Sequence, residues 1–300
     1  MSNEGDWVAL LGVKGGPAIR PGSSMPTGVL LRMGGRNVLV DAGLGTARAV
    51  CAQGVALHEI DLILVTHLHS DHYLELGPLL HTAWTGGLSR PVPVLGPRGL
   101  ETCWRHFLAA MDADIALRIA DEGRVPLAPL AKISTLEEGI TFDAAGLRIE
   151  ALRNHHPPLK DSFALRLIGA AGAVVLSGDT APFGGWEAFC EGADLLVHEA
   201  MLEDGVETLI ARHPNPHPLL REHILRSHTP AHEAGRIAAK AGVRALALNH
   251  FVPDGLPGCE PEVWEREVRR HWDGPLHMGR DGMRIGIGAA AGQGGPGHAA

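Results

Sequence analysis

The 300-residue chain is predicted to adopt a layered α/β fold. Short, continuous apolar runs, which are typical of strands buried on both faces, recur along it and alternate with segments of helical pattern. Hydrophobic residues make up 45% of the chain, which is enough for a buried core. Because layered α/β folds of this length often form one domain, we expect a single domain over residues 1–288 and a flexible Gly/Ala-rich tail over 289–300.

The order of elements begins with strands and then alternates. Strands are expected at Trp7–Gly12, Gly28–Met33 and Asn37–Asp41, and helices at Thr46–Gln53, Leu74–Trp84, Gly99–Ala110, Pro230–Ala241 and Pro261–Trp272. For the helix that starts near residue 230, Thr229 can cap it, Pro230 suits its first position and Gly242 can close it. In the last helix an apolar residue recurs every fourth position from Trp264 to Trp272, which predicts a stripe that faces the core.

The most informative stretch is Thr66–His72, which follows the apolar run Leu62–Val65. It carries four potential metal ligands in six residues: His67, His69, Asp71 and His72. Imidazole nitrogens and carboxylate oxygens suit zinc and similar divalent ions. Four ligands this close cannot all serve one tetrahedral ion that must also bind substrate and water, so two metals are implied. A single His after a strand is commonly a surface residue, but composition alone rarely produces this run.

Other apolar runs also end in polar residues, and these residues are Asp41, Asp179, His198 and Glu199, and Asn249 and His250. A further His pair, His155–His156, follows the strand-like segment Leu147–Leu152. Because layered α/β proteins bind their ligands at the carboxyl ends of strands, we expect these side chains to converge on one crevice.

This ensemble resembles the metallo-β-lactamase superfamily, whose hallmark is a His-x-His-x-Asp-His run followed downstream by His, Asp and His. The resemblance implies a four-layer αββα sandwich and two divalent ions, with Zn²⁺ expected and Mn²⁺ or Fe²⁺ as alternatives. It assigns one metal to His67, His69 and His156, the other to Asp71, His72 and His250, and the bridge between them to Asp179. His156 is favoured over His155 because similar family members place the ligand directly before a Pro-Pro pair and a Phe-Ala-x-Arg strand, here Phe163–Arg166.

Three further segments, Ser177–Thr180, Ala193–Ala200 and Ser227–Thr229, resemble the branch that contains RNase Z-type enzymes, metal-dependent arylsulfatases and related phosphodiesterases. In that branch Glu199 and His228 would pair, and His228 would protonate the leaving group. Asp71 would bind a metal and orient the attacking hydroxide. The alternative roles are a buried hydrogen-bonded pair and a polar residue that flanks a helix.

The expected function is hydrolysis of small anionic esters, such as aryl sulfates, phosphodiesters or phosphonate monoesters, by a metal-bound hydroxide. No Gly-x-Ser-x-Gly motif indicates a serine nucleophile. The alternatives are an RNase Z-type tRNA 3′ endonuclease, a lactonase or other carboxylic ester hydrolase, and a degenerate family member without metals. The lactonase is disfavoured because the chain's only tyrosine, Tyr73, is not where lactonases have theirs.

Composition shapes the expected partners. The net charge is −8, and no insertion resembles the basic exosite arm with which RNase Z enzymes bind tRNA, so nucleic acid is not expected as a partner. The expected partner is a small-molecule ester substrate. A homodimer is possible. The segment Arg212–His228 is either a lid that faces the substrate or a surface insertion, and Trp84 belongs either to the pocket wall or to the core. Scattered cysteines, no signal segment and no apolar run of membrane-spanning length predict a cytoplasmic protein without membrane contact.

Overall fold

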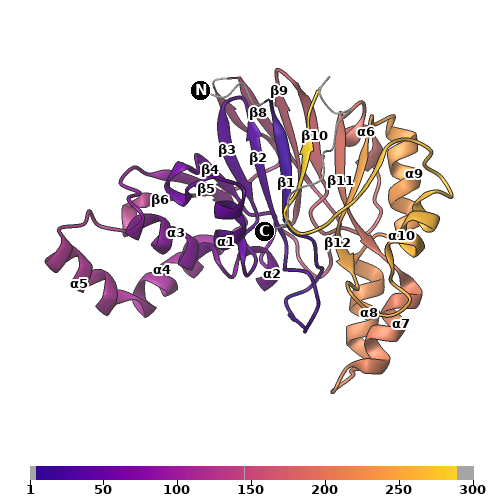
Figure 1. The fold of residues 1–300 in the computed structure, drawn as a ribbon, viewed down its shortest axis with the longest axis horizontal. Helices are drawn as coiled ribbons and strands as arrows, with labels where there is room; N and C mark the ends of the chain where they lie inside the picture. Colours follow the sequence, from indigo (N-terminus) through magenta and orange to yellow (C-terminus); the bar gives the residue numbers. More distant parts are fainter. Residues whose placement is uncertain (1–4, 145, 289–300) are drawn as a thin grey trace.

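The computed structural model describes residues 5–144 and 146–288, and the predicted tail at 289–300 lies outside the described residues. Two seven-stranded sheets pack face to face, and helices cover the outer face of each (Figure 1). The predicted four-layer αββα sandwich is therefore confirmed.

The first sheet has the strand order β14-β1-β2-β3-β4-β5-β6. Its strands are β1 (Trp7–Gly12), β2 (Gly28–Met33), β3 (Arg36–Val40), β4 (Leu62–Leu64), β5 (Val92–Gly96), β6 (Ala131–Thr135) and β14 (Met283–Gly286). The strands β3 to β6 pair in parallel, so their carboxyl ends meet at one edge of the sheet.

The second sheet has the order β13-β12-β11-β10-β9-β8-β7. Its strands are β7 (Gly139–Ala144), β8 (Leu147–Arg153), β9 (Phe163–Gly169), β10 (Gly172–Leu176), β11 (Leu195–Met201), β12 (Leu246–Val252) and β13 (Leu276–Met278). Here β10 to β13 are the parallel strands, and their carboxyl ends also lie together.

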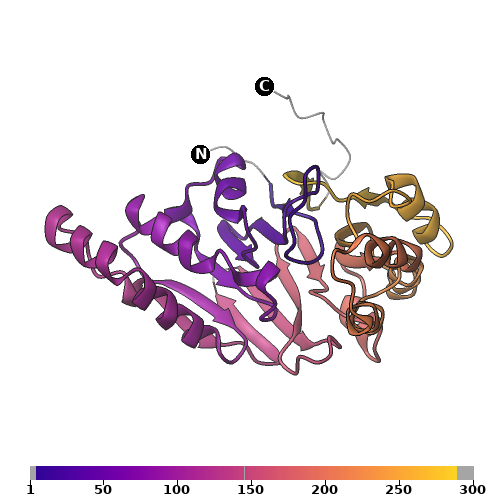
Figure 2. The same cartoon turned by 90° about the horizontal axis from the view of Figure 1, so that it is seen from below.

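Helices α1 (Thr46–Ala52), α2 (Ser70–Tyr73), α3 (Leu76–Thr85), α4 (Leu100–Ala110) and α5 (Asp112–Glu122) lie on the side of the first sheet, with short 3₁₀ turns at Leu57–Glu59 and Ala128–Leu130. Helices α6 (Trp186–Cys190), α9 (Ala231–Ala241) and α10 (Pro261–Val268) cover the second sheet, and α7 (Glu203–Arg212) and α8 (Pro218–Ser227) form a pair below it. Figure 2 shows α4 and α5 reaching away from the sheets along one side. No helix within the described residues is both long and apolar enough to cross a membrane.

Alternation along the strands divides the apolar side chains between two cores. In β4, Leu62 and Leu64 face the core between the sheets, whereas Ile63 faces the core under α3 and α4. Each strand of this kind is buried on both faces, which explains why the sequence shows continuous apolar runs rather than alternation. Trp84 is 1% exposed in the helix-side core, so it is not part of a pocket wall.

The start of α9 differs from its prediction. The helix begins at Ala231 with Pro230 as its N-cap, and the Thr229 hydroxyl donates to the Thr180 carbonyl instead of capping the helix. Gly242 does end the helix, with a left-handed φ of 61°. The predicted core stripe of the last helix is buried as expected, although α10 itself ends at Val268.

Candidate metal centre

The carboxyl ends of strands from both sheets meet at one place. His67 follows β4, His156 follows β8 and Asp179 follows β10. Glu199 and His250 belong to β11 and β12, close to where these parallel strands end. The predicted convergence of strand ends is therefore found, and it joins the two halves of the chain at a single site.

Two irregularities of the backbone aim side chains into this site. The pairing of β11 with β12 shifts register between Glu199 and Ala200, which leaves His250 as the extra residue of a β-bulge. His250 has a φ of 45°, and Asp41, directly after β3, has a φ of 62°. Positive φ is uncommon for residues other than glycine and is held in place here by the surrounding contacts.

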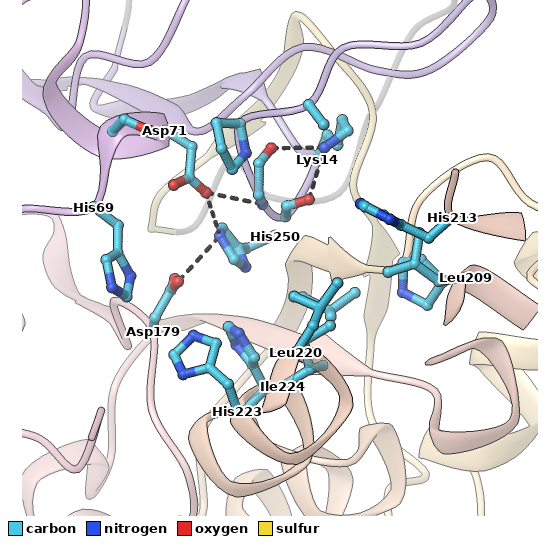
Figure 3. Close-up of a pocket in the computed structure, with 18 of the residues that line it drawn as sticks. Lys14, His69, Asp71, Asp179, Leu209, His213, Leu220, His223, Ile224 and His250 are labelled. Atoms are coloured by element: carbon cyan, nitrogen blue, oxygen red, sulfur yellow. Dashed lines mark hydrogen bonds and ion pairs between the residues drawn. The ribbon is translucent and has the colours of Figure 1, made fainter. Parts of the chain in front are cut away.

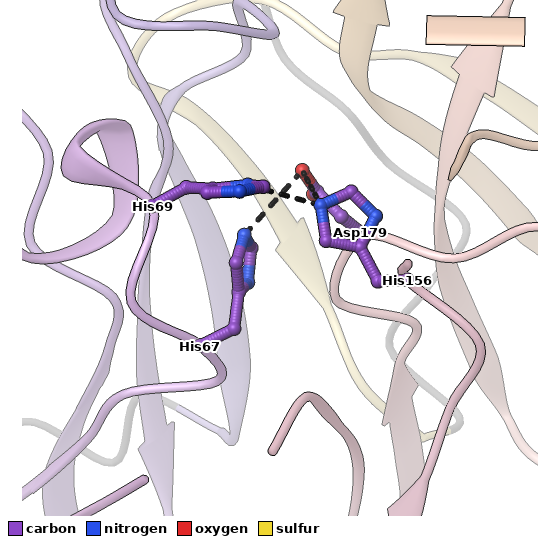
Figure 4. Close-up of side chains that lie close together, drawn as sticks. All are labelled: His67, His69, His156 and Asp179. Atoms are coloured by element: carbon purple, nitrogen blue, oxygen red, sulfur yellow. Dashed lines mark hydrogen bonds and ion pairs between the residues drawn. The ribbon is translucent and has the colours of Figure 1, made fainter. Parts of the chain in front are cut away.

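One cluster of potential ligands consists of His67, His69, His156 and Asp179 (Figure 4). The Nε2 atom of His156 lies 3.0 Å from Nδ1 of His69. Oδ2 of Asp179 lies 3.7 Å from Nε2 of His67 and 3.9 Å from Nε2 of His156. His155 is exposed and lies outside the cluster, so the structure places the favoured member of the His pair in the site.

A second cluster consists of Asp71, His72 and His250. Nε2 of His250 lies 3.3 Å from both Nε2 of His72 and Oδ2 of Asp71. The same Asp179 oxygen that faces the first cluster lies 3.3 Å from Nε2 of His72 and 3.1 Å from Nε2 of His250. One carboxylate oxygen thus stands between the two clusters.

The donor atoms fit two divalent cations. Ligands of a tetrahedral zinc ion with bonds of about 2.0–2.1 Å lie roughly 3.3 Å apart, which is close to the separations found here. Nε2 of His67 is buried and has no hydrogen-bond partner in the described part of the chain, as expected of an atom reserved for a metal. All seven predicted ligands are among the residues of the two clusters; their role as ligands stays a prediction.

A second layer of contacts fixes which imidazole nitrogens face inward. Nδ1 of His72 lies 2.7 Å from Oδ2 of Asp41, and Nδ1 of His156 lies 2.9 Å from the Ser227 carbonyl. Asp41 also accepts the Thr66 backbone N–H at 2.7 Å. Partners of this kind orient metal-binding histidines and are needed for tight metal binding.

The electrostatics of the site favour a cation. Burial lowers the pKa of His156 to about 3 and that of His67 well below its usual value, so both imidazoles are neutral and able to act as ligands. Burial acts against the charged form of Asp179, but His250 and His72 outweigh it and hold the pKa of Asp179 well below its usual range. Burial acts against the charged form of His72, but Asp179 and Asp41 outweigh it and raise the pKa of His72 well above its usual value, so a metal ion would displace a proton there.

Glu199 and His228 form a buried pair beside the clusters. Nδ1 of His228 lies 3.1 and 3.2 Å from the two Glu199 carboxylate oxygens. Burial alone would lower the pKa of His228, but the Glu199 carboxylate outweighs it and raises this pKa to about 9. Since Nδ1 is used by Glu199, Nε2 is the nitrogen that can deliver a proton to a bound ligand.

A cavity of about 320 Å³ opens beside the clusters. Asp71, Asp179 and His228 line one side of it, and the α7–α8 pair supplies an apolar side (Figure 3). The residues from that pair and its connection are Leu209, His213, Leu220, His223 and Ile224. The Arg212–His228 segment is therefore a wall of the cavity rather than a remote surface insertion.

Sequence reasoning missed two cationic residues at this cavity. Lys14 and Arg20, both in the connection after β1, line it. Neither belongs to a recognisable motif, and the only signal was the glycine-rich stretch around residues 15–16. Tyr73, the chain's only tyrosine, packs partly buried against the core under the helices and is not among the residues that line the cavity.

Comparison with known proteins identifies relatives over nearly the whole chain. The family model described as anti-Pycsar protein Apyc1 matches residues 9–213. A protein named Ribonuclease Z from Mycobacterium sp. (strain KMS) is 33% identical over 280 residues, which cover 93% of this chain and 95% of that protein.

Solved structures show the same fold. The metallo-β-lactamase fold protein YhfI from Bacillus subtilis superposes with a TM-score of 0.68 at 22% identity, over 94% of this chain and 99% of that one. The short form of human tRNase Z has a TM-score of 0.65 at 22% identity, with coverage of 94% and 99%.

The prediction that nucleic acid is not a partner is wrong, because the relatives bear the name of a ribonuclease. Net charge averages over the whole surface, whereas recognition of a phosphodiester depends on charges at the site. Two buried or half-buried cations, Lys14 and Arg20, stand at the cavity despite the negative total.

Proposed function

Since the chain belongs to the RNase Z-like branch of the metallo-β-lactamase superfamily and to the family of the anti-Pycsar protein Apyc1, we propose that this metallo-hydrolase is a phosphodiesterase with two metal ions. The observation that carries the proposal is the position of Asp179. Its Oδ2 atom lies between 3.1 and 3.9 Å from imidazole nitrogens of both clusters, so one side chain serves two cation positions. A single-metal or purely structural histidine cluster would have no need of this arrangement.

Two divalent ions, when bound, lower the pKa of water to about 7 and neutralise negative charge on a reacting ester. His67, His69 and His156 would hold one ion, Asp71, His72 and His250 the other, and Asp179 both. Zn²⁺ fits this donor set, and Mn²⁺ or Fe²⁺ are alternatives. Asp71 in addition orients the attacking water, because its carboxylate lies at the cavity wall.

The protein's own groups account for the rest of the reaction. His228, held by Glu199, donates a proton from Nε2 to the departing oxygen, as a positioned general acid does. Leu209, Leu220 and Ile224 enclose an apolar part of the substrate and exclude water from it. Lys14 and Arg20, which also line the cavity, add positive charge there.

Within this class, the size of the cavity supports a small phosphodiester with an apolar or aromatic group. At about 320 Å³ the cavity matches a small-molecule site. Aryl sulfates and phosphonate monoesters share the anionic centre and are further candidates. Cleavage of precursor tRNA is a second candidate function, which the 33% identity to a Ribonuclease Z over 93% of the chain favours.

A substrate panel tests the proposal. The metal-loaded protein is assayed with bis(p-nitrophenyl) phosphate, p-nitrophenyl sulfate, p-nitrophenyl phosphate, a lactone and a precursor tRNA. Hydrolysis of the phosphodiester is expected, and removal of the tRNA 3′ trailer in the same assay would add the second function. A protein that binds two ions but turns over only the lactone, or none of these substrates, contradicts the proposal.

A further inference from the structure

Lys14 is a buried cation at the edge of the site. Its side chain is only 2% exposed, although lysine is among the residues least often buried. It lies in the loop after β1, which runs beside β12 and reaches the cavity. A buried ammonium group requires hydrogen-bond acceptors, and those that Lys14 uses reveal its role.

The ammonium group binds the backbone of its own loop. Nζ donates to the Gly15 carbonyl at 2.8 Å and to the Gly16 carbonyl at 2.6 Å (Figure 3). On the other side of the Gly15–Gly16 peptide group, the Gly16 N–H donates to Oδ2 of Asp71 at 2.8 Å. The Gly15 carbonyl and the Gly16 N–H belong to one planar trans peptide and point in opposite directions, so fixing one fixes the other.

Every backbone N–H from residue 13 to residue 16 is hydrogen-bonded. Those of residues 13, 14 and 15 donate to the Asp281 carboxylate, to the Met25 carbonyl of the same connection and to the Phe251 carbonyl of β12. The fourth, that of Gly16, is the one that reaches a predicted metal ligand. Three hydrogen bonds thus hold the loop at residues 13 to 15, and the Gly15–Gly16 peptide faces Asp71.

Both glycines are required by the space and the backbone. A Cβ atom on Gly15 would lie 2.5 Å from Cγ2 of Val252 and 3.0 Å from Cε1 of His250, and Gly16 has a φ of 79°. Two successive glycines permit a peptide to rotate more freely than other residues do. The Lys14 ammonium group removes that freedom at the point where the loop meets the site.

We propose that Lys14 is a positioning residue for the metal site, which orients the Gly15–Gly16 peptide so that its N–H holds the Asp71 carboxylate in place. The inference rests on the proposed function in one respect, that Asp71 is a ligand of one ion. It differs from a role in substrate binding, which the position of Lys14 at the cavity would also permit. Metal affinity separates the two roles, because a residue that only binds substrate leaves the affinity for metal unchanged when no substrate is present.

The experiment is a zinc titration of metal-free protein against a chromophoric chelator. It compares the wild type with Lys14→Met, which keeps the length of the side chain and removes its donors. Lys132→Met is the matched control, since it removes an exposed lysine from β6 far from the site. Lys14→Met is expected to weaken binding of one of the two ions by about 10–100-fold, as loss of a contact behind a metal ligand does. Lys132→Met is expected to leave the affinity for both ions unchanged.

Two further variants sharpen the result. Lys14→Gln keeps an NH₂ group with two N–H donors for the carbonyls on a shorter side chain, so its affinity for that ion is expected between those of the wild type and Lys14→Met. If Lys14→Met fails to fold, Lys14→Gln decides by the same titration. Combined with Asp71→Ala, the Lys14 substitution is expected to add little to the loss, because both act through the same carboxylate.

The outcomes are distinct. Weaker binding of a single ion that depends on Asp71 supports the inference. Unchanged affinity for both ions, with only a raised KM for the phosphodiester, overturns it in favour of substrate binding. A wild-type protein that binds no zinc contradicts the proposed function itself, whereas a wild type with two ions and unaffected Lys14 variants contradicts only this inference.

Discussion

At the scale of single residues, the pair of His228 and Glu199 is the clearest link between geometry and chemistry. Nδ1 of His228 lies 3.1 Å from Oε1 of Glu199, both side chains are buried, and His228 lines the cavity. A carboxylate that orients a histidine and keeps it protonated is the usual arrangement of a general acid. His228 lies close to Asp179 and His250, but neither His228 nor Glu199 is among the proposed ligands of either ion.

We expect His228→Ala to retain both metals and to lose roughly 10²–10⁴-fold in kcat for esters with a poor leaving group. The loss should be much smaller for a p-nitrophenyl ester, because nitrophenolate leaves without a proton. Steady-state rates for the two ester types, together with metal content, check this. An equal loss on both would indicate a structural role for His228.

A second residue-scale prediction concerns His198, which lies on β11 directly before Glu199. It is buried, with Trp186 Nε1 donating to its Nε2 at 2.9 Å, and burial lowers the pKa of His198 to about 4. Between pH 6.5 and 4 the unfolded chain binds a proton here and the folded chain does not, so stability falls as pH falls through this window. The contribution is roughly 3 kcal/mol over the window.

Chemical unfolding of the metal-free protein at pH 7 and pH 4.5 measures this effect. His198→Gln removes the titrating group, so its free energy of unfolding should fall less between the two pH values than that of the wild type. Identical pH dependence in the two proteins would show that His198 does not contribute. The difference between the proteins cancels the titration of the other buried histidines.

Residue types in a tight motif were predictable, and a residue that acts through the backbone was not. The segment His67–His72 stands out in the sequence because His and Asp side chains can themselves bind metal ions. Lys14 carries no such signal. Its position depends on the closure of the loop after β1 against β12, which joins residues more than two hundred positions apart.

At the scale of elements, the strands were predictable and several helices were not. Continuous apolar runs identify β3, β4, β10, β11 and β12, whose ends carry the site. The helix α5 has no fully buried residue, and only Ile115 and Ile119, four positions apart, pack partly buried against the helix-side core. Neither α7 nor α8 was predicted as a helix. The segment Arg212–His228, which contains α8, was expected to be a lid or a surface insertion, although Pro218 at the first turn of α8 was an available signal for a helix start.

The α7–α8 pair also offers a test of substrate enclosure. Leu220 lines the cavity, whereas the adjacent Leu219 is 64% exposed. We expect Leu220→Ala to raise KM for aryl phosphodiesters by roughly 5–150-fold, which corresponds to the 1–3 kcal/mol of one lost apolar contact, with little change in kcat. Leu219→Ala is the control and should leave both constants unchanged. A similar KM in both variants would place the bound aryl group elsewhere.

At the scale of the whole molecule, the sandwich brings the predicted metal ligands from both halves of the chain to one point. The first sheet supplies the ligands that follow β4, and the second supplies His156, Asp179 and His250. The sequence motifs predicted this pairing, but the cavity beside it depends on how far apart the sheets and α8 lie. The prediction against a nucleic-acid partner was wrong for the same reason, because the net charge does not report where Lys14 and Arg20 lie.

The account rests most directly on Asp179 as the shared ligand of two ions. The decisive measurement is the metal content, by mass spectrometry, of wild-type protein and Asp179→Ala after zinc loading and desalting, with hydrolysis of bis(p-nitrophenyl) phosphate assayed on the same samples. Asp273→Ala, which removes an exposed carboxylate, is the control. We predict about two ions per chain and full activity in the wild type and the control, and loss of both ions and of hydrolysis in Asp179→Ala. A wild type without zinc, or an Asp179→Ala protein that keeps two ions and normal turnover, would contradict the account.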